Sequence, residues 1–262
     1  MKTRIVTAVV AAALFLPIVF YGGLPVVLLT YLLASIGLYE LLKMRKLSLF
    51  SVSGLLSYLL LWVILFPSQY QDVLAYLNYS KMELGIAMVL LLLTYTVITK
   101  NRFTFDDVAF SVLAAVYVGI GFYFFMETRQ AGLVYIFYSL FMIWATDSGA
   151  YFIGKAMGKT KLSPEISPNK TVEGSIGGIV CAMIIAALFV FLTDIDATLW
   201  SLLGITLFLS AFGQLGDLVE SALKRHFNVK DSGKLLPGHG GILDRFDSLL
   251  FVWPLLHFFH II

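Results

Sequence analysis

Two acidic side chains lie in parts of the chain that are otherwise strongly apolar. Asp147 falls inside the run WATDSGAYFIG, and Asp217 falls near the end of another run, in GQLGDLVE. A carboxylate in an apolar environment is costly unless it meets a cation, a metal ion or water. Such residues usually mark functional sites, and a structural salt bridge or an interfacial acid is the alternative for each.

Further acids follow at helical spacing. Glu220 is three residues after Asp217, and Asp247 is three residues after Asp244, so each pair shares one face of a helix. Asp217 and Asp244 come from the facing ends of consecutive apolar runs, so they could share an ion. Carboxylate oxygens favour Mg²⁺ or Mn²⁺ over zinc.

Basic residues and glycines accompany these acids in two long polar segments, Gly154 to Ser175 and Glu220 to Ser248. The first contains SPNKTVEG from Ser167, and the second contains PGHGG, whose backbone can approach a phosphate closely. Carboxylates, cations and glycines together predict phosphoryl or nucleotidyl transfer at a lipid interface. The alternative is that Lys224 and Arg245 only neutralise the acids.

The elements that must position these residues are membrane helices. Of the 262 residues, 60% are apolar and 13% are charged, and the mean hydropathy is +0.91. A soluble domain is about half apolar and about a quarter charged. The composition therefore excludes a cytosolic enzyme, a secreted domain and a disordered chain. The single cysteine, Cys181, excludes an intrachain disulfide, and no basic stripe for nucleic acid is visible.

Nine apolar runs approach the length of about 20 residues that a membrane helix needs. They are Ile5 to Tyr21, Leu24 to Leu42, Leu49 to Phe66, Leu84 to Thr99, Val108 to Met126, Ala131 to Ile153, Ile176 to Leu192, Leu199 to Val219, and Leu249 to Ile262. If the amino terminus is inside, only Lys81 and Arg129 lie outside, and the other 16 of the 18 Lys and Arg lie inside. This asymmetry satisfies the positive-inside rule.

We therefore predict an all-α, polytopic integral membrane protein with about nine transmembrane helices and a cytoplasmic amino terminus. Residues 1–126 are expected to form a scaffold of five spans that is chemically quiet. Residues 127–262 are expected to form a catalytic domain of four spans, with cytoplasmic loops at 154–175 and 220–248. Small residues such as Gly177 and Gly178 would allow close helix approach in a homodimer.

The stretch Ser221 to Asp247, SALKRHFNVKDSGKLLPGHGGILDRFD, resembles the signature of the phosphatidate cytidylyltransferases. That pattern is S-x-hydrophobic-K-R, four residues, K-D-x-small, then P-x-H-G-G-hydrophobic-x-D-R-hydrophobic-D, and every fixed position is present. The resemblance extends upstream to Thr146-Asp147, Ser167 to Thr171, and Gly213 to Asp217. It implies the conversion of CTP and phosphatidate into CDP-diacylglycerol and pyrophosphate, at the cytoplasmic face of a bacterial cell membrane.

The resemblance also implies a site. Asp217 and Asp244 would bind Mg²⁺, with a monovalent cation such as K⁺ as a companion. As our own hypothesis from the residue types, the ion is Mg²⁺ or Mn²⁺, Asp147 orients Lys170 or the metal, and the remaining site residues are assigned as follows. The cations that would contact the triphosphate or the lipid phosphate are Lys170, Lys224, Arg225, Lys230 and Arg245. The other candidates for substrate contact or for support of the site are Ser167, Asn169, Thr171, Asp231, His239, Gly240, Gly241 and Asp247.

Two other function classes are alternatives. The first is another nucleotide-using membrane enzyme, such as a polyprenol kinase or a sugar-phosphate transferase, although the D-G-x-x-A-R pattern of the CDP-alcohol phosphotransferases is absent. The second is a transporter or channel, which would carry polar residues along a transmembrane path. The gathering of polar residues in two segments, without an obvious internal repeat, argues against it.

Overall fold

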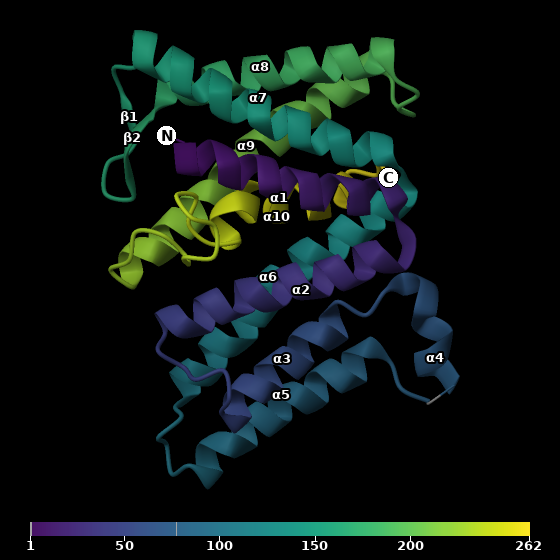
Figure 1. Cartoon of the computed structure of the whole chain (residues 1–262), viewed down its shortest axis with the longest axis vertical. Helices are drawn as coiled ribbons and strands as arrows, with labels where there is room; N and C mark the ends of the chain where they lie inside the picture. The colour runs from purple at the N-terminus through teal and green to yellow at the C-terminus, as the bar shows by residue number, and fades with distance from the viewer. Residues whose placement is uncertain (1, 77) are drawn as a thin grey trace. The chain divides into compact units, whose positions relative to one another are not determined.

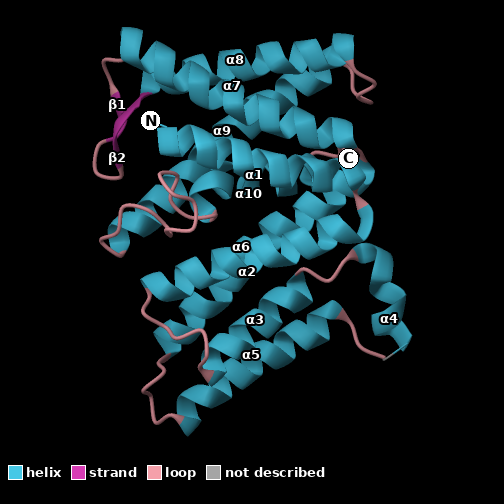
Figure 2. Cartoon of the chain, in the orientation of Figure 1, coloured by secondary structure: helices cyan, strands magenta, loops and turns pink. Residues whose placement is uncertain are grey.

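The chain folds mainly into α-helices (Figures 1 and 2). The computed structural model describes residues 2–76 and 78–262. In this part of the chain, two short strands form an antiparallel hairpin, β1 (Lys161–Ser163) and β2 (Ser167–Thr171). The helices are α1 (Lys2–Tyr21), α2 (Gly23–Met44), α3 (Val52–Ile64), the 3₁₀ turn η1 (Ser68–Tyr70), α4 (Gln71–Tyr76), α5 (Lys81–Ile98), α6 (Phe105–Ala131), α7 (Leu133–Met157), α8 (Val172–Leu192), α9 (Leu199–His226) and α10 (Leu243–Phe258).

The chain divides into two compact units. The first unit comprises the chain up to Glu127 together with Asp231–Leu243, and the second comprises Thr128–Lys230 with Asp244–Ile262. This division differs from the predicted scaffold and catalytic halves, because the loop at 231–243 groups with the amino-terminal helices. The roles assigned to the two halves stay predictions.

Among the described residues, six helices are long and apolar enough to cross a bilayer: α2, α5, α6, α7, α8 and α9. A seventh span results if α3 and the following segment to Tyr76, bent by 90°, count as one. α1 has a shorter apolar stretch, Ile5–Tyr21, and α10 has 16 residues. The all-α polytopic membrane fold is confirmed, whereas nine spans and a cytoplasmic amino terminus stay predictions.

The second unit contains a close helix pair, α7 and α8, which lie side by side in Figure 1. α8 directs its small residues toward the interior, and these are Gly174, Gly177, Gly178, Ala182 and Ala186. A Cβ atom on Gly178 would lie 2.6 Å from the carbonyl oxygen of Thr146 in α7. Small residues let helix backbones approach in a membrane. Gly177 and Gly178, suggested above as dimer contacts, are therefore used for packing within the chain.

Polar side chains also join the helices of the second unit. The hydroxyl groups of Thr146 in α7 and Ser210 in α9 are 2.9 Å apart, and the indole N–H of Trp253 in α10 donates to Ser139 Oγ in α7 at 3.1 Å. Lipid tails offer no hydrogen-bond partners, so each pair satisfies polar groups inside the protein and fixes the helix register. One of these contacts is directly beside Asp147.

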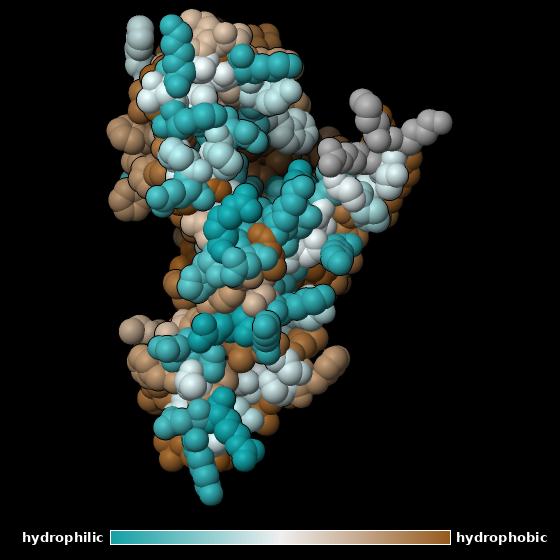
Figure 3. Space-filling model, turned by 90° about the vertical axis from the view of Figure 1, so that its left-hand side faces the viewer, coloured by the Kyte–Doolittle hydropathy of each residue, from teal (hydrophilic) through white to brown (hydrophobic). Residues whose placement is uncertain are grey.

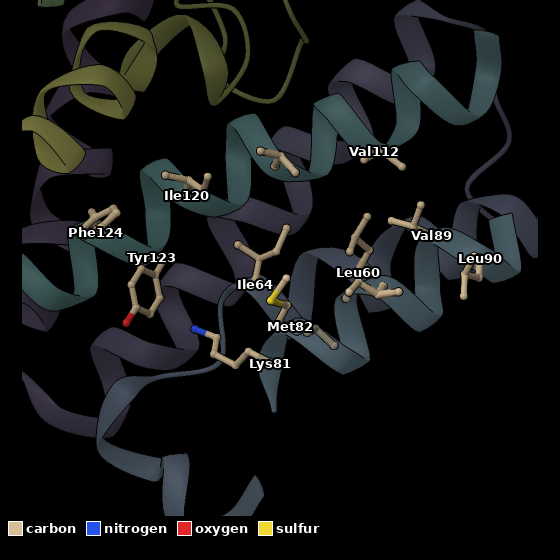
Figure 4. Close-up of a pocket in the computed structure, with 14 residues that line it drawn as sticks. Leu60, Ile64, Lys81, Met82, Val89, Leu90, Val112, Ile120, Tyr123 and Phe124 are labelled. Atoms are coloured by element: carbon tan, nitrogen blue, oxygen red, sulfur yellow. The ribbon is translucent and has the colours of Figure 1, made fainter. Parts of the chain in front are cut away.

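An apolar groove of about 540 Å³ lies between α3, α5 and α6 of the first unit (Figure 4). Leu60, Ile64 and Val89 are among its lining residues. Lys81 lies at the groove with its Nζ 4.0 Å from the ring centroid of Tyr123, and it donates a hydrogen bond of 2.7 Å to the carbonyl of residue 66. The ammonium is thus already engaged, and the groove offers mainly hydrocarbon surface.

The packing of α8 on α7 predicts a large effect of one methyl group. Gly178→Ala should lower the free energy of unfolding by about 1–3 kcal/mol, the usual cost of overpacking, because the new Cβ would meet the α7 backbone. Gly204→Ala is the control, since a Cβ at Gly204 has nothing within 4 Å. Thermal unfolding midpoints of the detergent-solubilised variants test this, and equal midpoints would contradict it.

Candidate active site

The β1–β2 hairpin is anchored to α7 and α8 through Thr171. The Thr171 hydroxyl oxygen caps α8 by accepting the N–H of Gly174 at 3.2 Å. There is room for this side chain because Gly154 and Gly158, near the end of α7, lack a Cβ: such atoms would lie 2.9 and 2.7 Å from Thr171 Oγ1. Thr171, predicted to contact substrate, therefore serves as a helix cap, and it holds the adjacent Lys170 in place.

One face of α9 carries polar side chains at intervals of three or four residues, namely Asp217, Glu220, Ser221 and Lys224. Lys170 Nζ lies 2.5 Å from Asp217 Oδ2, and the Ser221 hydroxyl donates to Asp217 Oδ1 at 3.3 Å. Both oxygens of this carboxylate therefore have a donor. Lys170 lies in the polar segment 154–175 and Asp217 near the end of an apolar run, and the structure brings these two predicted site residues together.

Lys224 joins α9 to the start of α10. Its ammonium pairs with Glu220 of the same helix and lies 2.7 Å from Asp244 Oδ1. The side chains of Lys224, Glu220 and Asp244 are 14%, 0% and 6% exposed. Buried charges are stable only when they are paired, so these three side chains depend on one another.

Close packing brings a second acid of α10 to α9. A Cβ atom on Gly216 would lie 2.7 Å from the carbonyl oxygen of Asp247, so the two backbones nearly touch there. Gly216 directly precedes Asp217, and the Asp247 carboxylate interacts electrostatically with Asp217 and Asp147. Asp247 therefore belongs with Asp217, in the turn after Asp244.

These side chains form a charge cluster in the second unit. Asp147, exposed on α7, interacts with Asp217, Lys170 and Arg245. The cluster consists of the carboxylates of Asp147, Asp217, Glu220, Asp244 and Asp247 and the cations of Lys170, Lys224 and Arg245. The cluster therefore contains five acidic and three basic side chains. Figure 3 views the side on which the hairpin lies in Figure 1, and many hydrophilic side chains are visible on it.

The surplus of acidic side chains and the hard oxygen donors of the charge cluster fit a divalent cation. Within residues 2–76 and 78–262, no group of three or more His, Cys, Asp or Glu side chains is arranged to hold a metal ion. Protein carboxylates would therefore supply only part of the coordination. Mg²⁺ is commonly bound in this way, through one or two carboxylates together with water and substrate phosphates.

The other predicted residues of the second unit lie around the hairpin or on its surface. Arg225 Nε donates to the carbonyl oxygen of Ile166 at 3.3 Å, so this guanidinium holds the hairpin turn. Ser167 begins β2 and is part of the strand ladder. Asn169 and Lys230 are exposed to solvent, where a ligand can reach them.

Four predicted residues lie in the first unit, on the loop 231–243. They are Asp231, His239, Gly240 and Gly241. Gly238 and Gly240 have φ values of 78° and 85°, the left-handed region that favours glycine, and Leu236 N–H donates to the Gly240 carbonyl at 2.9 Å. Nδ1 of His239 is buried and has no hydrogen-bond partner among the described atoms.

The whole chain has a clear family relationship. Residues 2–262 match the cytidylyltransferase family. The chain belongs to this family. It is 59% identical over 261 residues to the phosphatidate cytidylyltransferase of Bacillus subtilis (strain 168), across 98% of this chain and 97% of that protein. It is 52% identical over 257 residues to the phosphatidate cytidylyltransferases of Staphylococcus haemolyticus and Staphylococcus aureus (strain COL), across 98% of each chain. The resemblance seen in the signature is confirmed.

In this cytidylyltransferase family member, two buried acids were not among the residues predicted to form the site. Glu220 stands out only as a neighbour of Asp217, although it is the most buried charge of the cluster. Glu40 lies in the run Leu24 to Leu42, in the half predicted to be chemically quiet, yet it is buried and binds the loop 231–243. The sequence feature that could have identified Glu40 is the same one that singles out Asp147, namely an acidic residue inside an apolar run.

The pairing of Lys224 predicts a specific destabilisation. Lys224→Met should lower the free energy of unfolding by about 3–5 kcal/mol, the scale for breaking a buried ion pair, because Glu220 and Asp244 would lose their shared ammonium. Adding Glu220→Gln and Asp244→Asn should restore much of the loss. Thermal unfolding midpoints measure this. Lys230→Met, at an exposed lysine, is the control, and a Lys224→Met midpoint no lower than that of Lys230→Met would refute the idea.

Proposed function

We propose that this protein transfers the cytidylyl group of CTP to phosphatidate, giving CDP-diacylglycerol and pyrophosphate. The proposal is supported by the complete signature and by nearly full-length relatives named phosphatidate cytidylyltransferase. The observation that carries it is the charge cluster, in which Lys170 meets Asp217 and Lys224 meets Asp244. These residues come from the segments that the family resemblance marks.

The chemistry requires charge control more than proton transfer. A phosphatidate oxygen attacks the α-phosphorus of CTP, a new P–O bond forms there, and the bond to the bridging oxygen breaks as pyrophosphate leaves. The second pKa of a phosphomonoester is about 6, so the attacking group is already mostly ionised at neutral pH. The barrier arises from the approach of two polyanions and from charge on the departing pyrophosphate.

The cations of the second unit meet this requirement. Lys170 and Lys224 would exchange their present carboxylate partners for phosphate oxygens, and the exposed Arg245 would contact the triphosphate. Asp147 would orient the Lys170 ammonium, with which it interacts electrostatically. Asn169, exposed beside Lys170, would contact the nucleotide. Arg225 and Lys230 are further candidates for contact with the lipid headgroup.

We further propose that Asp217 and Asp244 hold Mg²⁺, or Mn²⁺, with a monovalent cation such as K⁺ as a companion. The surplus of acidic side chains in the charge cluster and the nearness of Asp247 to Asp217 support a cation there. When bound, Mg²⁺ supplies positive charge that stabilises the phosphate oxygens in the transition state. Lys170 and Lys224 would then be able to turn from the carboxylates toward phosphate.

The reaction is proposed to occur at the cytoplasmic face of a bacterial cell membrane. The positive-inside distribution of Lys and Arg supports this side, because both signature segments then lie in the cytoplasm. CTP would arrive from water, and the acyl chains of phosphatidate would remain in the bilayer and enter between the helices.

The position of a radioactive phosphate distinguishes this reaction from that of a kinase. Purified protein given phosphatidate, Mg²⁺ and CTP labelled at the α-phosphate should produce labelled lipid, and CTP labelled at the γ-phosphate should not. The reason is that cytidylyl transfer keeps the α-phosphate and releases the other two. Label from the γ-phosphate alone would identify a lipid kinase, and ion flux without lipid product in proteoliposomes would identify a transporter.

The metal assignment predicts the behaviour of Asp244→Asn. Loss of one carboxylate charge from the proposed Mg²⁺ site should reduce kcat by at least about 100-fold, as expected when electrostatic stabilisation of the transition state is lost. CDP-diacylglycerol formation per folded protein is the measurement. Lys43→Gln, on an exposed lysine of α2, should leave activity near wild type. Near wild-type turnover in Asp244→Asn would exclude this residue as a metal ligand.

A further inference from the structure

Glu40 is a buried carboxylate near the end of α2 that holds the loop 231–243. The residue is 3% exposed. Ser232 Oγ donates to Glu40 Oε2 at 2.8 Å, the N–H of Ile242 donates to Oε1 at 2.9 Å, and the N–H of Leu243 donates to Oε2 at 3.0 Å. All of these residues belong to the first unit. The carboxylate therefore binds both ends of the loop.

Two glycines of this loop are required by the approach of Glu40. A Cβ atom on Gly233 would collide with Oε1, Cδ and Cγ of Glu40, and one on Gly241 would collide with Glu40 Oε1 and Ser232 Oγ. Neither glycine has a left-handed φ, so lack of space excludes a side chain there. The loop fits closely around the carboxylate.

Glu40 also caps α10. The first N–H groups of an α-helix have no partner within the helix, and they carry the positive end of its dipole. Leu243 is the first residue of α10, and its N–H and that of Ile242 both donate to Glu40. Asp244 directly follows Leu243, so the cap determines where the acid-bearing turns of α10 begin.

We propose that Glu40 is a positioning residue for the transfer reaction, an inference that rests on the function proposed above. It acts through the loop, because α10 with Asp244 and Arg245 starts from a point that the Glu40 bonds hold in place. The same bonds occupy backbone donors at a helix start, a setting that otherwise attracts phosphate. Glu40 thereby leaves the basic side chains as the groups that bind the anionic substrates.

Glu40→Gln is the first test, because it keeps the size of the side chain and removes its charge and one acceptor oxygen. We expect kcat to fall about 100-fold, the scale of a misplacement of about 1 Å, with a much smaller change in KM for CTP. Glu83→Gln is the matched control. Glu83 accepts the N–H of Ser80 at 2.7 Å in the capping box of α5, a helix outside the signature. Wild-type kcat in Glu40→Gln, or an equal loss in Glu83→Gln, overturns the proposal.

A double-mutant cycle tests the same contact from the side of the loop. Gly233→Ala should lower kcat, since its methyl group would push on Glu40, and it should cost nothing further in a Glu40→Ala background. If the reductions in kcat caused by the two substitutions multiply in the double variant, the methyl group does not act through Glu40. This cycle also decides the matter if Glu40→Gln folds poorly, because folded Gly233→Ala with wild-type kcat overturns the proposal.

Hydrogen–deuterium exchange separates this inference from the proposed function. In the peptide 231–243, Glu40→Gln should speed exchange of the Ile242 and Leu243 amides about tenfold, as expected when their acceptor weakens. The readout needs no catalysis. If wild-type protein makes no CDP-diacylglycerol, the proposed reaction fails. If exchange in Glu40→Gln stays as slow as in wild type, Glu40 does not hold the loop and the positioning role is wrong.

Discussion

The Lys224 ammonium lies between the carboxylates of Glu220 and Asp244, in a unit made largely of apolar helices. The arrangement of α9 and α10 depends on this shared ammonium. Neither carboxylate would be stable there alone, because low dielectric makes an isolated charge costly. Gly216 allows the two helices to approach, but apolar packing in lipid distinguishes poorly between neighbouring registers. The shared charge selects the turn of α10 that faces α9, and it places the acids of both helices on the same side.

The same balance of charges suits the handling of phosphate. Lys170 and Lys224 are each bound to carboxylates, so the folded protein can keep cations in a partly buried setting before any substrate arrives. In the proposed reaction these lysines would exchange carboxylate for phosphate, because a phosphate oxygen presents the same kind of acceptor as a carboxylate oxygen. The surplus of acidic side chains is the reason that a cation is proposed to bind beside them. Acids and bases in this cluster are therefore complementary parts of one site.

Much of the fold was predictable, because a long apolar run in lipid must form a helix to satisfy its own backbone. The meeting of Lys170 and Asp217, 47 residues apart, was partly foreseeable, since the positive-inside rule predicts that the segment of Lys170 and the end of the run that carries Asp217 lie on one side of a membrane. The three-residue strand β1 has no detectable periodicity, so the hairpin was not foreseen. Thr171 and Glu40 act through contacts with residues that are distant in the sequence. The periodicity of apolar residues carries no information about such contacts. The number of spans is hard to predict for a similar reason, because short helices such as α10 depend on their neighbours.

The residues that donate hydrogen bonds to Glu40 are translated long after Glu40 itself. Ser232 follows it by 192 residues and Leu243 by 203. A ribosome that adds about 5–20 residues per second needs about 10–40 s to cover that interval. During this time the loop donors that bind the Glu40 carboxylate in the folded protein have not yet been synthesised. A chain truncated before residue 232 would lack the donors that Ser232, Ile242 and Leu243 give to Glu40, so the packing of α2 depends on residues near the carboxyl terminus.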